Sequence, residues 1–386
     1  MHHNIRLLKI FNFLIGFSLF APLAIIYFSK VSGSYVLGAS IFGITMLSSA
    51  IFEVPTGIWS DMVGRRGTII LGSWARVAAF VLYAIGLSYW WLVAGAILEG
   101  VSRSFYSGNN DAFLHDTLAD DDMEGDFDDH LGKTNSTEQL ALGLSAVFGG
   151  ILASISFSLL TWLTVISQII LLLVSYNFIE PRSHTKIDSN LFNHIKEALY
   201  LFKSNKKLRL LSIGSIVNFA FGESKFQFRS AFVNTLWPLW AIGLSSILSN
   251  FGASLSFYFS KQIITKVPKE RLLLIKNIYG KVVGIFAYGI PTIISPLLQT
   301  TQSLFHGVGI VAETALFQRE FSDKQRATMG SLNSLGGSIL FFVVSLFLGI
   351  LADKFSPATA MLILSLVDSP VIYIYWKLFN KHQPQV

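Results

Sequence analysis

Long apolar runs separated by short polar stretches dominate the pattern of hydrophobic and polar positions in this chain. A helix needs about 20 apolar residues to cross the roughly 30 Å hydrocarbon core of a bilayer. Twelve runs of suitable length, the fifth starting as early as Asn135, occur near residues 8–28, 36–60, 67–87, 90–113, 140–155, 159–178, 208–233, 236–259, 272–288, 293–317, 329–351 and 358–379. The pattern predicts twelve membrane-spanning helices, six on each side of a polar stretch.

Phe, Leu and Ile dominate these runs, so we expect helices rather than the strands of a membrane barrel. The first run is too long for a signal peptide, and no A-x-A cleavage site follows it before Lys30. We therefore expect this run to form the first membrane-spanning helix.

The composition strengthens this interpretation. Hydrophobic residues make up 52% of the chain and charged residues 13%, whereas soluble domains carry about a quarter charged residues. The chain has no cysteine, which excludes a secreted disulfide scaffold. The same figures argue against a soluble enzyme and a disordered protein, and they favour an integral membrane protein.

The net charge of +6 reflects a bias between the two sets of loops. If the N-terminus is cytoplasmic, the inner loops contain nearly all the basic residues of the loops, and the outer loops keep only Lys30 and Lys354. Basic loops remain on the cytoplasmic side of a membrane. We therefore expect both termini in the cytoplasm, and the basic charge does not indicate a nucleic-acid partner.

The two halves of the chain resemble each other. The segment 150–154 (GILAS) matches 349–353 (GILAD), and 95–99 (GAILE) aligns with 309–313 (GIVAE). Together with the six-plus-six count, these matches predict two parallel repeats. The expected organisation is a six-helix bundle at 1–180, a cytoplasmic linker at 181–207 and a second bundle at 208–386. Within the linker, 193–203 has the spacing of a short amphipathic helix on the lipid surface, and a plain tether is the alternative.

A glycine-rich and basic motif stands between the second and third runs, with the sequence GIWSDMVGRR at 57–66. It resembles the signature loop of the major facilitator superfamily, G-x-L-a-D-r-x-G-r-r/k. The matching residues are Gly57, Asp61, Gly64, Arg65 and Arg66.

Three positions of the motif depart from the family pattern, since Trp59, Ser60 and Met62 replace the usual Leu, Ala and Arg. The resemblance nevertheless covers the whole chain, because the helix count, the loop position and the linker agree with it. It implies the all-α fold of that family, with twelve transmembrane helices in two six-helix bundles. It also implies a conformational latch in which Asp61 contacts the start of the eleventh helix, near Arg326, when the transporter is open outward.

Ionisable residues within the predicted spans are the candidate functional residues, because such groups are costly in the membrane and usually face a cavity. Glu99 and Arg103 are spaced i, i+4 and can neutralise each other on one helix face. Glu313 repeats Glu99 in the tenth span and has no basic residue one turn away. Two roles are open for these three residues. One is to line a cavity or couple transport to protons, and the other is to form structural ion pairs between helices.

The seventh span contains a second group, Glu223, Lys225 and Arg229. Lys225 and Arg229 lie one turn apart and are candidates for binding an anionic group. Lys281 lies in the ninth span, whereas Asp368 in the twelfth is less expected to line a cavity. Arg76 lies nearer the cytoplasmic end of its helix, where extension of the side chain to the membrane surface is a sufficient explanation.

The sequence offers no pattern for a metal site, a cofactor or enzymatic catalysis. The acidic stretch 120–131 imitates a calcium-binding loop, but Leu131 stands where a bidentate Glu is required. We therefore interpret it as a solvated acidic loop.

The leading hypothesis is a monomeric, multi-pass secondary transporter of a bacterial cytoplasmic membrane, surrounded by lipids. It exports a small amphipathic or drug-like solute in exchange for protons. The alternatives are uptake of a small, anionic metabolite by proton symport, and a membrane sensor or scaffold that transports nothing.

Overall fold

Helices form every regular element described in the computed structural model, which covers residues 2–182, 200, 202–203, 205–320 and 323–380. No strand occurs in these ranges, so the predicted all-α class is confirmed. The side chains of Asp61 and Arg326 lie outside the described residues. Most of 193–203, where the sequence predicts an amphipathic helix, lies outside them as well.

The internal contacts divide the chain into two compact units. Unit 1 comprises residues 1–188 and 238–244, and unit 2 comprises 189–237 and 245–386. The short segment 238–244 belongs to the second half of the sequence but packs with the first.

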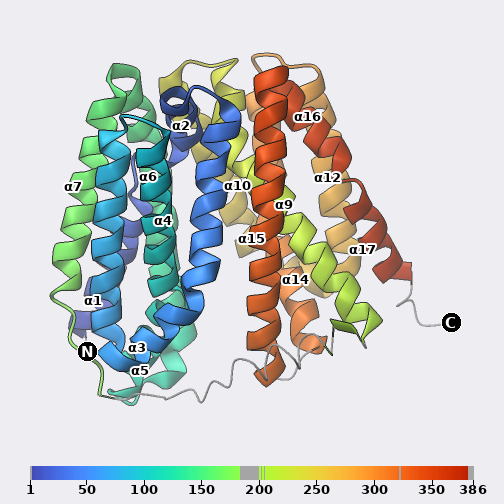
Figure 1. Ribbon diagram of the computed structural model, residues 1–386. Helices are drawn as coiled ribbons and strands as arrows, with labels where there is room; N and C mark the ends of the chain where they lie inside the picture. The colour runs from blue at the N-terminus through green and yellow to red at the C-terminus, as the bar shows by residue number, and fades with distance from the viewer. Residues whose placement is uncertain (1, 183–199, 201, 204, 321–322, 381–386) are drawn as a thin grey trace. The chain divides into compact units, whose positions relative to one another are not determined.

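Unit 1 is built around long helices that run alongside one another (Figure 1). Short 3-10 turns at Ala21–Leu23, Glu124–Asp126 and Leu239–Ala241 complete it. Its helices are α1 (His2–Gly16), α2 (Ala24–Ser32), α3 (Tyr35–Ile85), α4 (Tyr89–Tyr106), α5 (Asn109–Ala119), α6 (Phe127–Ile155) and α7 (Phe157–Ser175).

Local sequence signals explain where several of these helices begin and end. The hydroxyl of Ser34 accepts a hydrogen bond from the amide of Leu37, and Ser156 caps α7 in the same way through Leu159. Such caps satisfy amide groups that a helix leaves unpaired at its start. Gly86 ends α3 in the left-handed conformation, with a φ of 48°, which glycine adopts without steric cost.

The helix α3 contains the second and third predicted spans, joined at a kink. Gly64 interrupts the helix with a φ of 80° and a ψ of 172°. The second and third spans are therefore two helices that meet directly at Gly64. This glycine belongs to the motif at residues 57–66, which we call the motif loop.

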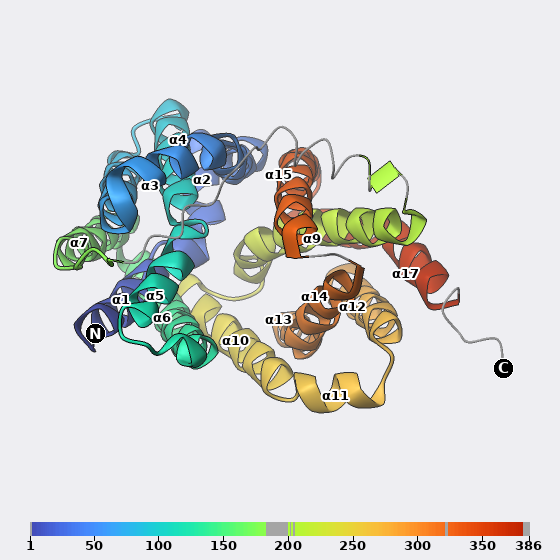
Figure 2. The same cartoon turned by 90° about the horizontal axis from the view of Figure 1, so that it is seen from below.

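Unit 2 contains helices of very different lengths, and Figure 2 shows α9 and α11 along their length. Its helices are α9 (Lys206–Asn234), most of α10 (Ile242–Tyr258), α11 (Ser260–Lys266), α12 (Lys269–Gly289), α13 (Ser295–Thr300), α14 (His306–Glu320), α15 (Asp323–Lys354), α16 (Pro357–Val367) and α17 (Pro370–Asn380).

Two of the predicted spans in unit 2 are discontinuous. The tenth is divided into α13, a 3-10 turn at Thr301–Phe305 and α14. The twelfth is divided into α16 and α17 at Asp368 and Ser369. Pro370 explains the second break, because proline has no amide hydrogen and its ring disfavours a helical conformation in the preceding residue.

Eight segments of the described chain are long and apolar enough to cross a membrane. They correspond to the first, second, third, fifth, sixth, ninth, eleventh and twelfth predicted spans. The other four are less clear for physical reasons: α4 and α9 contain charged residues in their interiors, α10 has 17 residues and α14 has 15. The count of twelve and the cytoplasmic termini therefore stay predictions.

The predicted topology can be tested with single cysteines, because the native chain has none. Leu87 is 77% exposed between α3 and α4, and a side chain on Gly125 would meet no atom within 4 Å. In intact cells, Leu87→Cys should react with an impermeant maleimide. Gly125→Cys should react only after the membrane is opened, and labelling of both in intact cells would contradict the topology.

Candidate functional site

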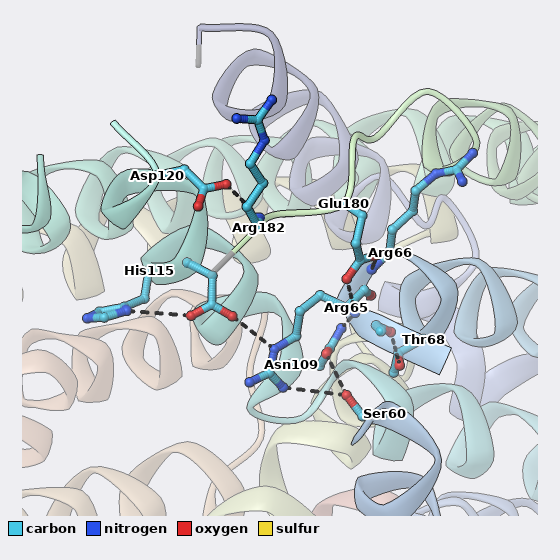
Figure 3. A network of polar contacts seen from close by, with 11 residues as sticks. Ser60, Arg65, Arg66, Thr68, Asn109, His115, Asp120, Glu180 and Arg182 are labelled. Carbon is cyan, nitrogen blue, oxygen red and sulfur yellow. Dashed lines mark hydrogen bonds and ion pairs between the residues drawn. The ribbon is translucent and has the colours of Figure 1, made fainter. Parts of the chain in front are cut away.

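The kink at Gly64 is held by a carboxylate from the other end of unit 1. Glu180 Oε1 accepts a hydrogen bond from the Arg65 amide at 2.6 Å, and its Oε2 accepts one from the Arg66 amide at 2.8 Å (Figure 3). These amides begin the helix that restarts after the kink. A carboxylate is favourable at that position because the amides and the helix dipole are both positive there.

Arg65 also connects the motif loop to α5. Its Nε lies 3.2 Å from Asp116 Oδ2, and the two side chains are 15% and 3% exposed. Asn109 donates to the Arg65 carbonyl oxygen at 3.1 Å and accepts from Ser60 at 3.0 Å. Because a buried ion pair is costly to break, this network fixes the motif loop against α5.

Arg66 completes the attachment by donating from Nη2 to the carbonyl oxygen of Tyr176 at 2.9 Å. Both arginines of the motif loop therefore have partners within unit 1. The sequence did not predict the role of Glu180, because this residue stands at the start of a linker more than a hundred residues from the motif. The expected contact of Asp61 near Arg326 lies outside the described side chains and stays a prediction.

Glu99 and Arg103 pair as their spacing indicates. Glu99 Oε1 accepts from Arg103 Nε at 3.2 Å and from Nη2 at 3.1 Å. Its second oxygen accepts from the Tyr83 hydroxyl at 2.9 Å. Tyr83 also covers Gly95, where a Cβ would lie 2.7 Å from its ring. Three donors thus surround the Glu99 carboxylate.

Glu313 has a different environment. No hydrogen bond to its carboxylate occurs among the described residues, although Lys276 and Tyr375 are close enough to interact with it electrostatically. Lys276 covers Gly309, where a Cβ would lie 2.6 Å from the lysine Cδ. The sequence showed no basic residue one turn from Glu313, but α12 supplies one from a neighbouring helix.

Lys225 and Lys281 share one carboxylate. Lys225 Nζ lies 2.7 Å from Asp368 Oδ2, and Lys281 forms a short ion pair with Asp368 Oδ1 and donates to the Ser369 hydroxyl at 2.8 Å. The three side chains come from α9, from α12 and from the break between α16 and α17. Together they form what we call the ion triad. Asp368 is the less expected member from the sequence, but the structure places it between two cations.

The remaining charged residues of α9 do not join the triad. Arg229 donates to the Ser245 carbonyl oxygen at 2.9 Å, and Glu223 accepts from Gln227 at 2.7 Å. The three residues that the sequence grouped on the seventh span therefore contact different neighbours.

Arg76 does not extend to the membrane surface, as the sequence had suggested. Arg76 is only 6% exposed. Its guanidinium donates to Gln168 Oε1 at 2.6 Å and to the Ile15 carbonyl oxygen at 3.0 Å. The expectation of a snorkelling side chain is wrong, because α1 and α7 offer acceptors inside the bundle that a single helix cannot reveal.

In the described part of the chain, no group of three or more His, Asp or Glu side chains is placed around a common point. In the acidic stretch 120–131, Asp120 accepts from the Arg182 amide at 2.8 Å and Asp129 pairs with Lys133. These residues serve contacts within unit 1.

The chain matches one protein family over most of its length. The sequence profile of the Major Facilitator Superfamily matches residues 7–340. An uncharacterised MFS-type transporter of Methanocaldococcus jannaschii is 22% identical over 275 residues, covering 69% of this chain and 62% of that relative. The inner membrane transport protein YajR of Escherichia coli is 30% identical over 89 residues, covering 22% of this chain and 19% of that protein.

Solved structures share the fold over nearly the whole chain. The nucleoside transporter NupG has a TM-score of 0.80 at 14% identity, covering 97% of this chain and 99% of its own. A D-xylose-proton symporter has a TM-score of 0.73 at 14% identity, covering 97% of both chains. At these identities the likeness concerns the fold alone.

Replacing Gly64 with Ala should destabilise the protein. Alanine at this combination of positive φ and extended ψ, which is nearly exclusive to glycine, costs about 1–3 kcal/mol, and its Cβ would lie 2.6 Å from Glu180 Oε1. We expect a lower melting temperature in detergent than for the wild type. Gly57→Ala in the same motif is the matched control, because a Cβ there meets no atom within 4 Å. Equal melting temperatures for the two variants would show that the capped kink is unimportant.

Proposed function

The chain belongs to the major facilitator superfamily, and on this basis we propose that it moves a small solute by alternating access, driven by protons. Members of the family are transporters rather than enzymes. In the proposed cycle, the bundles of the two halves rock around a site near the middle of the membrane. The proposed location is the bacterial cytoplasmic membrane, with both termini inside.

The contrast between Glu99 and Glu313 carries the proposal of proton coupling. Glu99 accepts three hydrogen bonds. Glu313 accepts none from the described residues, and its nearby cation is Lys276. A carboxylate without donors in an apolar bundle gains more from binding a proton than one with three. We therefore assign the proton to Glu313 and a structural role to Glu99 with Arg103.

Protonation of Glu313 would also change its neighbours. The charge of Lys276 would lose its counterion, so the pair would favour a rearrangement or the approach of another anion. This provides a physical link between proton uptake and a change of conformation, because an ion in a bundle of low dielectric constant needs a partner.

Symport of a polar solute fits this geometry better than export of a drug-like compound in exchange for protons. The three cations Lys225, Lys276 and Lys281 lie within unit 2 against two carboxylates, Asp368 and Glu313. This surplus of positive charge suits an anionic or polar solute. In the flux measurements below, export of an amphipathic solute in exchange for protons would move solute and protons in opposite directions. A sensor without transport would give no flux.

Glu313→Gln should abolish proton-driven transport while keeping solute exchange. Glutamine keeps the shape of the side chain but cannot take up a proton. Membrane vesicles would be screened with polar metabolites for solute-evoked proton movement, and the responding solute would then be used for counterflow in the variant. Glu270→Gln at the start of α12 serves as a control outside the proposed site.

Glu99→Gln should instead lower stability, because it weakens the pairing of Arg103. Hydrogen bonds to a charged group contribute about 1.5–3 kcal/mol each, and we expect a lower melting temperature. Proton-coupled flux that is unchanged in both glutamine variants would exclude Glu313 as the proton carrier.

Asp61→Asn tests the latch that the family resemblance implies. Asparagine keeps the size of the side chain but removes the charge that would face the start of α15 near Arg326. We expect transport to fall at least tenfold, a change of about 1.4 kcal/mol, with unchanged protein in the membrane. Normal transport by Asp61→Asn would mean that the motif acts only through Gly64, Arg65 and Arg66.

A further inference from the structure

The ion triad of Lys225, Asp368 and Lys281 carries more positive than negative charge. Two ammonium groups share a single carboxylate, and the side chains are only 22%, 15% and 13% exposed. Burial of an ion without a counterion is costly. The triad is therefore electrostatically incomplete by one negative charge.

The wider interior of unit 2 does not supply that charge. Lys276 is close enough to Lys225 to interact with it, and it also faces Glu313. Away from the helix ends, the acidic and basic side chains of α9, α10, α12, α14, α16 and α17 are Glu223, Lys225, Arg229, Lys276, Lys281, Glu313 and Asp368. Four cations thus stand against three carboxylates, and the surplus remains.

The triad also has hydrogen-bond donors to spare. An ammonium group has three N–H donors. Lys225 directs one to Asp368, and Lys281 uses two, for Asp368 and the Ser369 hydroxyl. Among the described residues no further acceptor contacts either ammonium. A carboxylate has two oxygens that accept such charge-assisted hydrogen bonds at short range.

The position of the triad suits a transport site. It lies where the twelfth span breaks between α16 and α17, and discontinuous helices are typical of binding sites in secondary transporters. Its members come from three separate segments of unit 2. A shift of α17 would therefore change the distances from Asp368 to both lysines. An ion pair within a single helix would keep its distance during such a shift.

We propose that Lys225 and Lys281 bind a carboxylate group of the transported solute, while Asp368 holds the two ammonium groups toward each other. The anion supplies the missing negative charge and takes the unused donors. This inference rests on the proposed transport function, but it does not depend on Glu313 as the proton carrier.

Stability measurements without any solute test the charge surplus. Lys225→Gln leaves Lys281 and Asp368 as a one-to-one pair, so the melting temperature in detergent should stay equal or rise. Asp368→Asn leaves both lysines without a counterion, so the melting temperature should fall. If the triad were only a structural ion pair, Lys225→Gln would lower the melting temperature as Asp368→Asn does, and the proposal would be wrong.

Binding is tested with acetate and benzoate, and with acetamide and benzamide as neutral counterparts, at constant ionic strength. At least one carboxylate should raise the melting temperature of the wild type with increasing concentration, as expected for a ligand of the folded state, and its amide should not. Lys225→Gln should lose this response. Lys266→Gln, an exposed lysine at the end of α11, should keep it.

Several outcomes would overturn the proposal. They are no response of the wild type to either carboxylate, an equal response to the amides, and an equal response in Lys225→Gln. A response to inorganic phosphate that exceeds the response to both carboxylates would overturn the assigned class of anion. Carboxylate binding without any transport would instead count against the proposed function, so the two failures can be told apart.

Discussion

Each charged side chain within the apolar spans needs a partner, and this constraint shapes both units of the protein. An ion costs several kcal/mol to place in the membrane interior unless it is paired or reaches water. The described partners mostly lie on other helices. Arg76 reaches α7 and α1, Tyr83 of α3 reaches Glu99, and Asp368 receives lysines from α9 and α12. Pairing of charges therefore also determines which helices are neighbours.

Sequence reasoning succeeds where the relevant spacing is local. The apolar runs predict the helices, and the i, i+4 spacing of Glu99 and Arg103 predicts their ion pair. It fails where a partner comes from a distant segment. Glu180 at the end of unit 1, Asp368 at a helix break and Lys276 beside Glu313 carry no local signal that names their contacts. Spacing along one helix defines a face, but it does not define which helix covers that face.

The two units use one architectural device in different forms. In unit 1, Arg76 on the third span contacts Gln168 on the sixth and a carbonyl oxygen of the first. In unit 2, Lys281 on the ninth span contacts Asp368 on the twelfth, which also contacts Lys225 on the seventh. We call each of these two sets of contacts a clamp. Each clamp joins the first, third and sixth spans of its own half. This correspondence supports the internal repeat more directly than the short matching pentapeptides do.

The difference between the clamps has a physical consequence. The clamp of unit 1 joins one cation to two neutral acceptors, and one of them is the carbonyl oxygen of Ile15 next to the end of α1 at Gly16. The clamp of unit 2 joins two cations, Lys225 and Lys281, to the carboxylate of Asp368 at a broken helix. Either lysine can therefore leave Asp368 for another anion, because the other lysine still neutralises the Asp368 carboxylate. Two arrangements of similar energy are what a switching element requires. If the halves share an ancestral clamp, the substitution of charged for neutral partners in unit 2 converts a fixed joint into one that an anion can reset.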